Sequence, residues 1–180
     1  MQRLGTRPER RSLRVRRATL ASMAGARHEK RHMPKCFIDT NILLYAKDRS
    51  DPSKHKAANR WVEAALRRSA VVLSAQSLRE YYANMLRLDR RPNAVQELRA
   101  ELHQLETFVP DYLRMDRLVE AWSIQDRHRL SFWDAMLIAS ALAANCSLFL
   151  SEDMNGGQRI ETLTVVNPFT TTPEAVLGAP

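Results

Sequence analysis

Short apolar runs alternate with longer amphipathic stretches along most of the chain. Strands are expected where β-branched and aromatic residues gather, at 36–39, 71–73, 148–150 and 163–166. Between them, apolar residues recur at helical spacing over 53–68, 75–89, 93–106, 112–128 and 132–145. A further short strand is expected at Phe108-Val109. Strands that alternate with helices predict an α/β sandwich with a mainly parallel sheet.

Breakers and polar residues mark where these elements end. Pro92 separates the helices on either side of it, Ser53 is a start signal for the first long helix, and a turn is expected at 155–157. No glycine occurs between Gly25 and Gly156, so the first strand–helix turn has none. A P-loop and a dinucleotide fingerprint both need glycine there, because the backbone must approach phosphate closely. The sequence therefore excludes nucleotide binding by either device.

The composition predicts a globular protein of the cytoplasm. Hydrophobic residues make up 44% of the 180 positions, which is enough for the core of one domain. Cys36 and Cys146 belong to no C-x-x-C or Cys/His cluster, which argues against a disulfide framework and a structural zinc site. The longest apolar stretch, 135–144, is much shorter than the roughly 18 residues of a membrane span. We therefore expect no membrane association, and the N-terminus does not resemble a secretory signal.

The net charge of +8 is concentrated at the N-terminus. Residues 1–35 contain 11 Lys and Arg but only two Glu, whereas residues 36–180 contain 17 basic and 18 acidic residues. The rest of the chain is therefore close to neutral, and a general basic surface for nucleic acid cannot be assigned to it.

The same asymmetry predicts how the chain is organised. We expect a disordered basic extension at 1–33, one domain at 34–170 and a C-terminal tail at 171–180. The favoured explanation of the extension is a start codon placed too early, with translation beginning at Met33 or Met23. A nucleic-acid-binding arm and an organellar transit peptide are the alternatives.

Four acidic residues stand at the boundaries of predicted elements. Asp39 and Asp153 follow strands, whereas Glu80 and Asp134 lie in the first turns of helices. The carboxyl ends of parallel strands and the starts of the following helices share one rim of a sheet, which is where ligands bind in such folds. The four acids could therefore converge there, although this holds less firmly for Asp134, whose helix follows another helix. Asp48, Asp51 and Asp111 could lie on the same rim, so convergence alone does not prove a site.

A purely structural role is the alternative for each acid. The two acids after strands would be turn or helix-cap residues, and the two in helices would form capping boxes with Ser77 and Ser131. The helix that contains Asp134 is apolar on nearly every side, as a buried helix is. A carboxylate there must be paired, hydrogen-bonded or bound to metal.

Convergence of the four carboxylates would favour a divalent cation. Two unit charges about 4 Å apart repel by roughly 4 kcal/mol at an effective dielectric of about 20, and a cation relieves that repulsion. Oxygen ligands favour Mg²⁺ or Mn²⁺ over zinc, and none of the five His stands beside these acids.

Five segments resemble the PIN-domain family in their order and spacing. They read PKCFIDTNILLYA at 34–46, LSAQSLREYY at 73–82, LSFWDAMLIA at 130–139, LSEDM at 150–154 and VNPF at 166–169. The last segment resembles the end of the VapC-type toxins within that family. The resemblance covers residues 34–169, and the motifs are specific as a set although each is weak alone. It implies a three-layer sandwich with a short parallel sheet flanked by helices.

The resemblance also implies a metal site made of these acids. Asp39, Glu80 and Asp134 match the three acidic positions of the family's site. Asp153 matches a fourth, more variable acid, and the neighbouring Glu152 could take its place. The implied cofactor is Mg²⁺, with Mn²⁺ as a substitute, and the implied reaction is metal-assisted hydrolysis of RNA phosphodiesters.

Supporting residues and partners follow from the same resemblance. Asn41 and Ser151 match polar residues that orient the carboxylates. As in VapC-type toxins, the expected partners are an RNA substrate, a small VapB-like antitoxin and a second copy of the chain. All of these are expectations from kinship.

Contacts with RNA must be local, because the domain is near neutral. Arg87, Arg90 and Arg91, at the end of the helix that contains Glu80, are candidate phosphate contacts, although arginines at helix ends more often neutralise the helix dipole or stay solvated. Trp133 and Phe132 could stack on bases, but core packing is the favoured interpretation for both.

Other functions remain open. A haloacid-dehalogenase-like phosphatase needs a second Asp where this chain has Asn41, which counts heavily against it. A related nuclease that acts on DNA, or on RNA outside a toxin–antitoxin pair, is one alternative. A non-enzymatic nucleic-acid-binding protein that acts through its basic extension is another.

Overall fold

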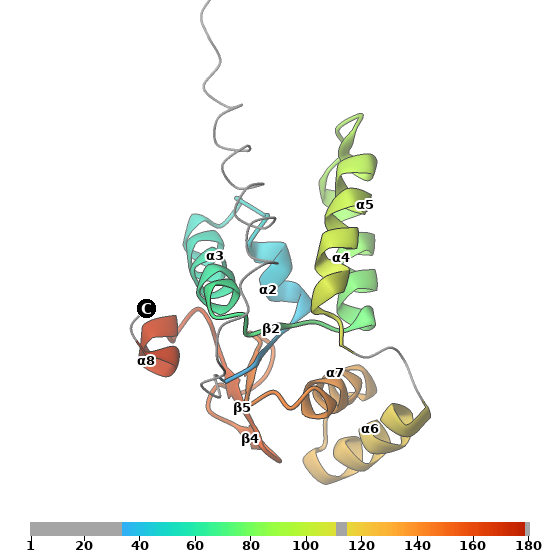
Figure 1. Cartoon of the computed structure of the whole chain (residues 1–180), viewed down its shortest axis with the longest axis vertical. Helices are drawn as coiled ribbons and strands as arrows, with labels where there is room; N and C mark the ends of the chain where they lie inside the picture. The colour runs from blue at the N-terminus through green and yellow to red at the C-terminus, as the bar shows by residue number, and fades with distance from the viewer. Residues whose placement is uncertain (1–33, 111–114, 179–180) are drawn as a thin grey trace, which may run out of the picture. The chain divides into compact units, whose positions relative to one another are not determined.

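The computed structural model describes residues 34–110 and 115–178 (Figure 1). The predictions for the basic extension at 1–33 fall outside the described residues, as does Asp111. Within the described part of the chain, no helix is long and apolar enough to cross a membrane.

A five-stranded sheet forms the middle layer, in the order β2-β1-β3-β5-β4. The first three pairings are parallel, and only β4 and β5 pair antiparallel, so the prediction of a mainly parallel sheet is confirmed. The central strands are apolar throughout because both of their faces are covered. The strands are β1 (Cys36–Ile38), β2 (Val71–Val72), β3 (Leu148–Leu150), β4 (Arg159–Ile160) and β5 (Leu163–Val166).

Helices cover both faces of the sheet, as the three-layer prediction requires. In chain order the helices are α2 (Thr40–Tyr45), α3 (Pro52–Arg67), α4 (Ala75–Leu88), α5 (Ala94–Leu105), α6 (Met115–His128), α7 (Phe132–Ala143) and the short α8 (Pro173–Leu177). The α4–α5 hairpin extends away from the sheet, and α7 lies close to its base (Figure 1).

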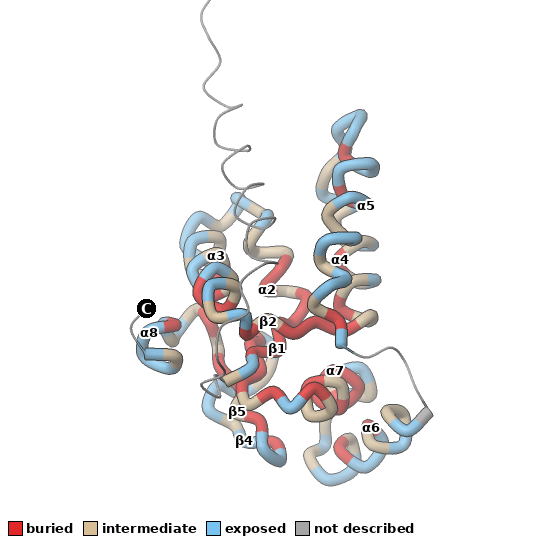
Figure 2. Tube along the Cα trace, viewed as in Figure 1, coloured by how far each residue is buried: buried red, intermediate tan, exposed pale blue. Residues whose placement is uncertain are grey.

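Alternation along the strands divides the interior into two cores. Phe37 and Phe149 stack with ring centroids 5.2 Å apart and pack against α6 and α7. Ile38 and Leu150 face the opposite side, where α2, α3, α4 and α5 cover them. Buried residues accordingly follow one another through the strands and along α7 (Figure 2).

Most predicted elements are present, and the differences are local. The predicted strand at Phe108-Val109 is wrong: Glu106–Phe108 forms a 3-10 turn, although the Phe108 carbonyl still accepts a hydrogen bond from the Leu73 N–H at 2.9 Å. Ser53 is not the cap of α3, because Asp51 accepts hydrogen bonds from the N–H groups of Ser53 and Lys54. The short elements α2, β4 and α8 were not predicted.

Two neighbouring strands end side by side at the rim where Asp39 and Asp153 stand. The pairing of β1 with β3 sets Ile38 opposite Leu150, so the next residues, Asp39 and Ser151, leave the sheet together. The Asp39 N–H donates to the Leu150 carbonyl at 3.0 Å, and the Ser151 N–H donates to that of Val166 at 3.1 Å. The sheet therefore fixes the backbone of both residues.

Candidate active site

Asp39 is a buried carboxylate at the carboxyl end of β1. Its side chain is only 8% exposed and accepts a hydrogen bond from the Ser151 hydroxyl at 2.8 Å. Its backbone occupies the N-cap position of α2, but its side chain makes no capping hydrogen bond. A capping role therefore does not account for this carboxylate.

Burial raises the pKa of Asp39 to about 6. Hydrogen bonds from the Ser151 hydroxyl and the Thr40 N–H lower that pKa, while repulsion from the carboxylates of Asp153 and Glu80 raises it further. The three acids are thus near enough to act on one another electrostatically. A cation beside them would favour the ionised form of Asp39.

Asp153 is hydrogen-bonded by Asn41 and is joined to Asp39 through Ser151. The Asn41 amide donates a short hydrogen bond to Asp153 Oδ2, and the Asp153 N–H donates to the Ser151 hydroxyl oxygen at 3.2 Å. Since the Ser151 hydroxyl donates in turn to Asp39, one fully buried serine sets the positions of both acids. Asn41 and Ser151 thus contact the carboxylates that they were expected to orient.

Glu152 points elsewhere. Its carboxylate pairs with the Lys54 ammonium group, which also donates to the Tyr45 hydroxyl at 3.1 Å. The same ammonium lies 4.5 Å from the ring centroid of Tyr45 and 5.2 Å from that of Phe169. Of the two neighbouring acids, Asp153 is therefore the one that faces Asp39.

Glu80 is held by both of its carboxylate oxygens. Thr40 Oγ1 donates to Oε2 at 2.7 Å, and the Gln76 amide donates to Oε1 at 2.9 Å. A capping box with Ser77 is wrong, because α4 starts earlier and Ser74 caps it by accepting from the Ser77 N–H. The carboxylate is instead directed toward α2 and the end of β1.

Asp134 is held at the start of α7, and the predicted cap is confirmed. The Asp134 N–H donates to Ser131 Oγ at 3.1 Å, and that hydroxyl donates to Asp134 Oδ2 at 2.7 Å. No hydrogen bond or ion pair joins this carboxylate to the other three acids. The link is indirect: the Gln76 amide that binds Glu80 also donates weakly to the Trp133 carbonyl at 3.5 Å.

The ligand atoms that these acids offer are of the type that a hard divalent cation prefers. The acids offer only oxygen, and Asp134 and Asp153 each have one carboxylate oxygen without a hydrogen-bond partner among the described residues. As they stand, however, no three Asp, Glu, His or Cys side chains of the described residues form a group that could hold an ion. Enclosing a cation would take a change of rotamer in at least one of them.

The other acids expected at this rim serve local structure. Asp48 accepts hydrogen bonds from the backbone and hydroxyl of Ser50, and Asp51 caps α3. Turn and cap contacts therefore account for both carboxylates.

The predicted RNA contacts differ from one another in their surroundings. Arg91 is paired with Asp89 at 2.6 Å and with Glu97 at 3.3 Å, so its charge is already neutralised. Arg87 and Arg90 are exposed and form no ion pair with the described residues. Arg87 lies seven residues beyond Glu80 on α4, about 10 Å further along the helix axis.

The two aromatic residues at the start of α7 differ in how far they are buried. Phe132 packs against the core beneath α7, as expected. Trp133 is 64% exposed, so the prediction that it packs in the core is wrong. Successive helical residues point about 100° apart, and only one of two neighbours can face the α6–α7 interface.

Sequence reasoning missed the roles of Thr40, Gln76 and Lys54 as partners of acids. Gln76 could have been found from its spacing, since it precedes Glu80 by one helical turn. Thr40 and Lys54 meet their partners across 40 and 98 residues of chain, and no local pattern reports such contacts.

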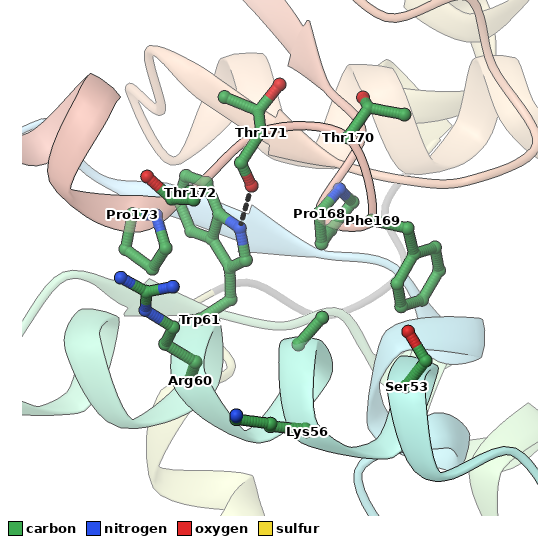
Figure 3. Close-up of a pocket in the computed structure, with 11 residues that line it drawn as sticks. Ser53, Lys56, Arg60, Trp61, Pro168, Phe169, Thr170, Thr171, Thr172 and Pro173 are labelled. Carbon is green, nitrogen blue, oxygen red and sulfur yellow. Dashed lines mark hydrogen bonds between the residues drawn. The ribbon is translucent and has the colours of Figure 1, made fainter.

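A separate open pocket of about 270 Å³ lies between α3 and the loop before α8 (Figure 3). The Trp61 indole N–H closes part of it by donating to the Thr171 carbonyl at 2.8 Å, and Arg60 is paired with Glu174 at 2.7 Å. No acidic side chain lines this pocket, so it is distinct from the candidate site.

Comparisons with known proteins agree with this architecture. A solved structure described as a toxin-antitoxin complex from Klebsiella pneumoniae matches with a TM-score of 0.51 and 16% identity, covering 74% of this chain and 98% of that one. No curated protein matches. The family model of the PIN domain, whose members are generally nucleases that use divalent metal ions, matches residues 36–156. The chain therefore belongs to the PIN domain family.

Proposed function

We propose that this chain is a metal-dependent endoribonuclease and the toxin of a toxin–antitoxin module. The observation that supports it most strongly is the buried Asp39, whose pKa is raised to about 6 by burial and by the nearby Asp153 and Glu80. An acid in such a position is costly to a metal-free fold and is typical of functional sites. Membership of a family whose members are generally nucleases supports hydrolysis of phosphodiesters as the reaction at that site.

In this proposal Asp39, Glu80, Asp134 and Asp153 hold Mg²⁺, with Mn²⁺ as a substitute. Bound there, the ion supplies positive charge that offsets the charge of a phosphodiester and lowers the pKa of water. The Ser151 hydroxyl and the Asn41 amide keep the carboxylates of Asp39 and Asp153 oriented.

Further residues of the chain hold the remaining carboxylate and bind substrate. Thr40 and Gln76 orient the carboxylate of Glu80 through hydrogen bonds, as Ser151 and Asn41 orient the other two. Arg87 and Arg90 are the better-placed candidates for phosphate contacts, because Arg91 is already paired.

A toxin–antitoxin role is supported by the solved complex that shares the fold. The proposed partners are a VapB-like antitoxin and a second copy of this chain. Exposed apolar side chains on the α4–α5 hairpin, at Leu86, Leu88 and Val95, are available to such partners.

The test uses the purified full chain beside its Asp39→Asn variant. Each is incubated with an unstructured single-stranded RNA and with DNA of the same sequence, in Mg²⁺, Mn²⁺ or EDTA. Cleavage of RNA by the wild type only, and only with metal, is expected. Cleavage of DNA alone would identify a different nuclease, and equal behaviour of the two proteins would refute the site.

Expression in a bacterial host tests the toxin role separately. Growth arrest with discrete RNA fragments is expected from the wild type and not from Asp39→Asn. Cleavage in vitro without arrest would indicate an RNA-processing nuclease instead of a toxin.

A further inference from the structure

Trp133 is the most exposed large hydrophobic side chain among the described residues, at 64%. A single exposed apolar residue is ordinary on a protein surface, so exposure alone says little. What makes this one informative is that it directly precedes Asp134, one of the four acids of the candidate site.

The backbone of Trp133 is tied to that site. The Gln76 amide that donates to Glu80 at 2.9 Å also reaches the Trp133 carbonyl at 3.5 Å. On the other side, Asp134 is held by its cap to Ser131, and consecutive Cα atoms lie about 3.8 Å apart. The backbone of Trp133 is therefore linked to Glu80 through Gln76 and to Asp134 along the chain.

The ring itself is restrained. The rings of Phe132 and Trp133 meet edge to face, with centroids 5.2 Å apart and planes at 66°. Phe132 is in turn anchored in the core under α7. An indole held in this way loses less conformational freedom when a ligand binds to it.

We propose that Trp133 binds substrate by stacking on an unpaired base of single-stranded RNA next to the scissile phosphate. This inference rests on the proposed nuclease function. Every base offers a flat π face, so an aromatic side chain can hold RNA without reading its sequence. The residues from 36 onward carry 17 basic and 18 acidic side chains, so general electrostatic attraction supplies little of the affinity.

The surroundings favour a base over a protein partner. A protein contact of this kind usually sits inside a wider apolar patch. No other exposed large hydrophobic side chain lies on α7, and the remaining ones in the described residues belong to other elements: Leu86, Leu88, Val95, Val119, Trp122 and Val176. A single exposed ring on α7 beside the carboxylate of Asp134 matches a stacking platform better.

Kinetics on single-stranded RNA test the proposal with a matched control. Trp122, on α6, is 48% exposed and provides the control substitution. Trp133→Ala is expected to raise KM roughly 5- to 50-fold with little change in kcat, as loss of one stacked base would. Trp133→Phe should recover most of the affinity, and Trp122→Ala should match the wild type. A Trp133→Ala variant with wild-type KM would overturn the proposal.

Two further measurements distinguish base stacking from the other roles that Trp133 could have. Mn²⁺ affinity should be the same in Trp133→Ala and in the wild type, since a lower affinity would mean that the substitution disturbed the metal site. Binding of the RNA should quench the fluorescence of the Trp122→Phe variant even if no cleavage occurs. Absence of quenching, or a Trp133→Ala variant that changes only the oligomeric state, would assign the ring to another role and refute stacking.

Discussion

The candidate site joins two halves that are built in different ways. Asp39 and Asp153 follow β1 and β3, two strands paired in register, and one serine hydroxyl contacts both acids' segments. Glu80 and Asp134 lie on α4 and α7, and among the described residues the hydrogen bond that links these helix starts is the long one from Gln76 to the Trp133 carbonyl.

The two halves differ in how firmly their carboxylates are held in place before a metal ion binds. Backbone hydrogen bonds in the sheet fix the strand-end half, so its carboxylates stay together against their mutual repulsion, which contributes to the raised pKa of Asp39. In the helix-start half Glu80 is held by Thr40, whereas α7 is linked to α4 by a side-chain bond of 3.5 Å that constrains it little, so Asp134 is the acid that can adjust. We expect the strand ends to form the permanent part of a metal site and the helices to complete it.

The largest expected effect is the loss of cleavage in Asp39→Asn. Removing the buried charge should lower kcat/KM at least about 100-fold, because the buried acid that interacts electrostatically with both Asp153 and Glu80 is gone. Asp48→Asn is the matched control, since Asp48 serves only a local turn with Ser50. Similar losses in both variants, measured on single-stranded RNA, would mean that the rim as a whole, and not this acid, matters.

Substitutions of Ser151 and Ser131 compare the two halves of the site directly. Ser151→Ala should weaken Mn²⁺ binding roughly 10- to 100-fold, because this hydroxyl orients Asp39 and the backbone of Asp153. Ser131→Ala removes the cap of α7 and should cost about 1 kcal/mol of unfolding free energy with a smaller effect on the metal. Calorimetric titration and denaturant unfolding measure the two effects. The reverse ranking would show that the helix half is the rigid one.

The pH dependence of metal binding should follow Asp39. A cation binds the ionised carboxylate, so affinity should fall about fivefold from pH 6 to pH 5, given the pKa of about 6. The metal-free fold should respond in the opposite sense. Because the native state holds this proton more tightly than the unfolded chain, its stability should decline as pH rises from about 4 to 6.

Asp39→Asn supplies the control for that pH slope. The variant should lack the decline and be more stable than the metal-free wild type at pH 7 by about 3 kcal/mol. Denaturant unfolding at several pH values measures this, and parallel curves for the two proteins would argue against a buried, ionised Asp39.

The smallest expected effect concerns Thr40, which connects the halves. Thr40→Val removes the hydrogen bond to Glu80 while keeping the shape of the side chain, and should lower kcat/KM about 3- to 10-fold. Thr40→Ser retains the hydroxyl and should keep most of the activity. If the serine variant is as impaired as the valine variant, packing against α4 and not the hydrogen bond is responsible.

How far the sequence predicts this molecule depends on the range of the interaction. The strands and α7 were predictable because their apolar runs are local, and the acids stand out at the ends of those runs. The cap of α7 was predictable for the same reason. The length of α2 and the existence of β4 were not, because elements of six and two residues carry almost no periodic signal.

The partners of the acids were beyond local reasoning. Whether Glu152 or Asp153 faces Asp39 depends on Lys54, which approaches from α3 and is 98 residues away in sequence. Likewise, the choice between Phe132 and Trp133 for the core depends on how α7 packs against α6.

Mn²⁺ binding to the full chain, in the absence of RNA, tests the central claim most directly. Wild type, Asp39→Asn and Asp48→Asn are titrated side by side at pH 7. We predict equal affinity for wild type and Asp48→Asn, and an affinity at least about tenfold lower for Asp39→Asn. Equal affinity in all three proteins would show that these carboxylates do not form a metal site.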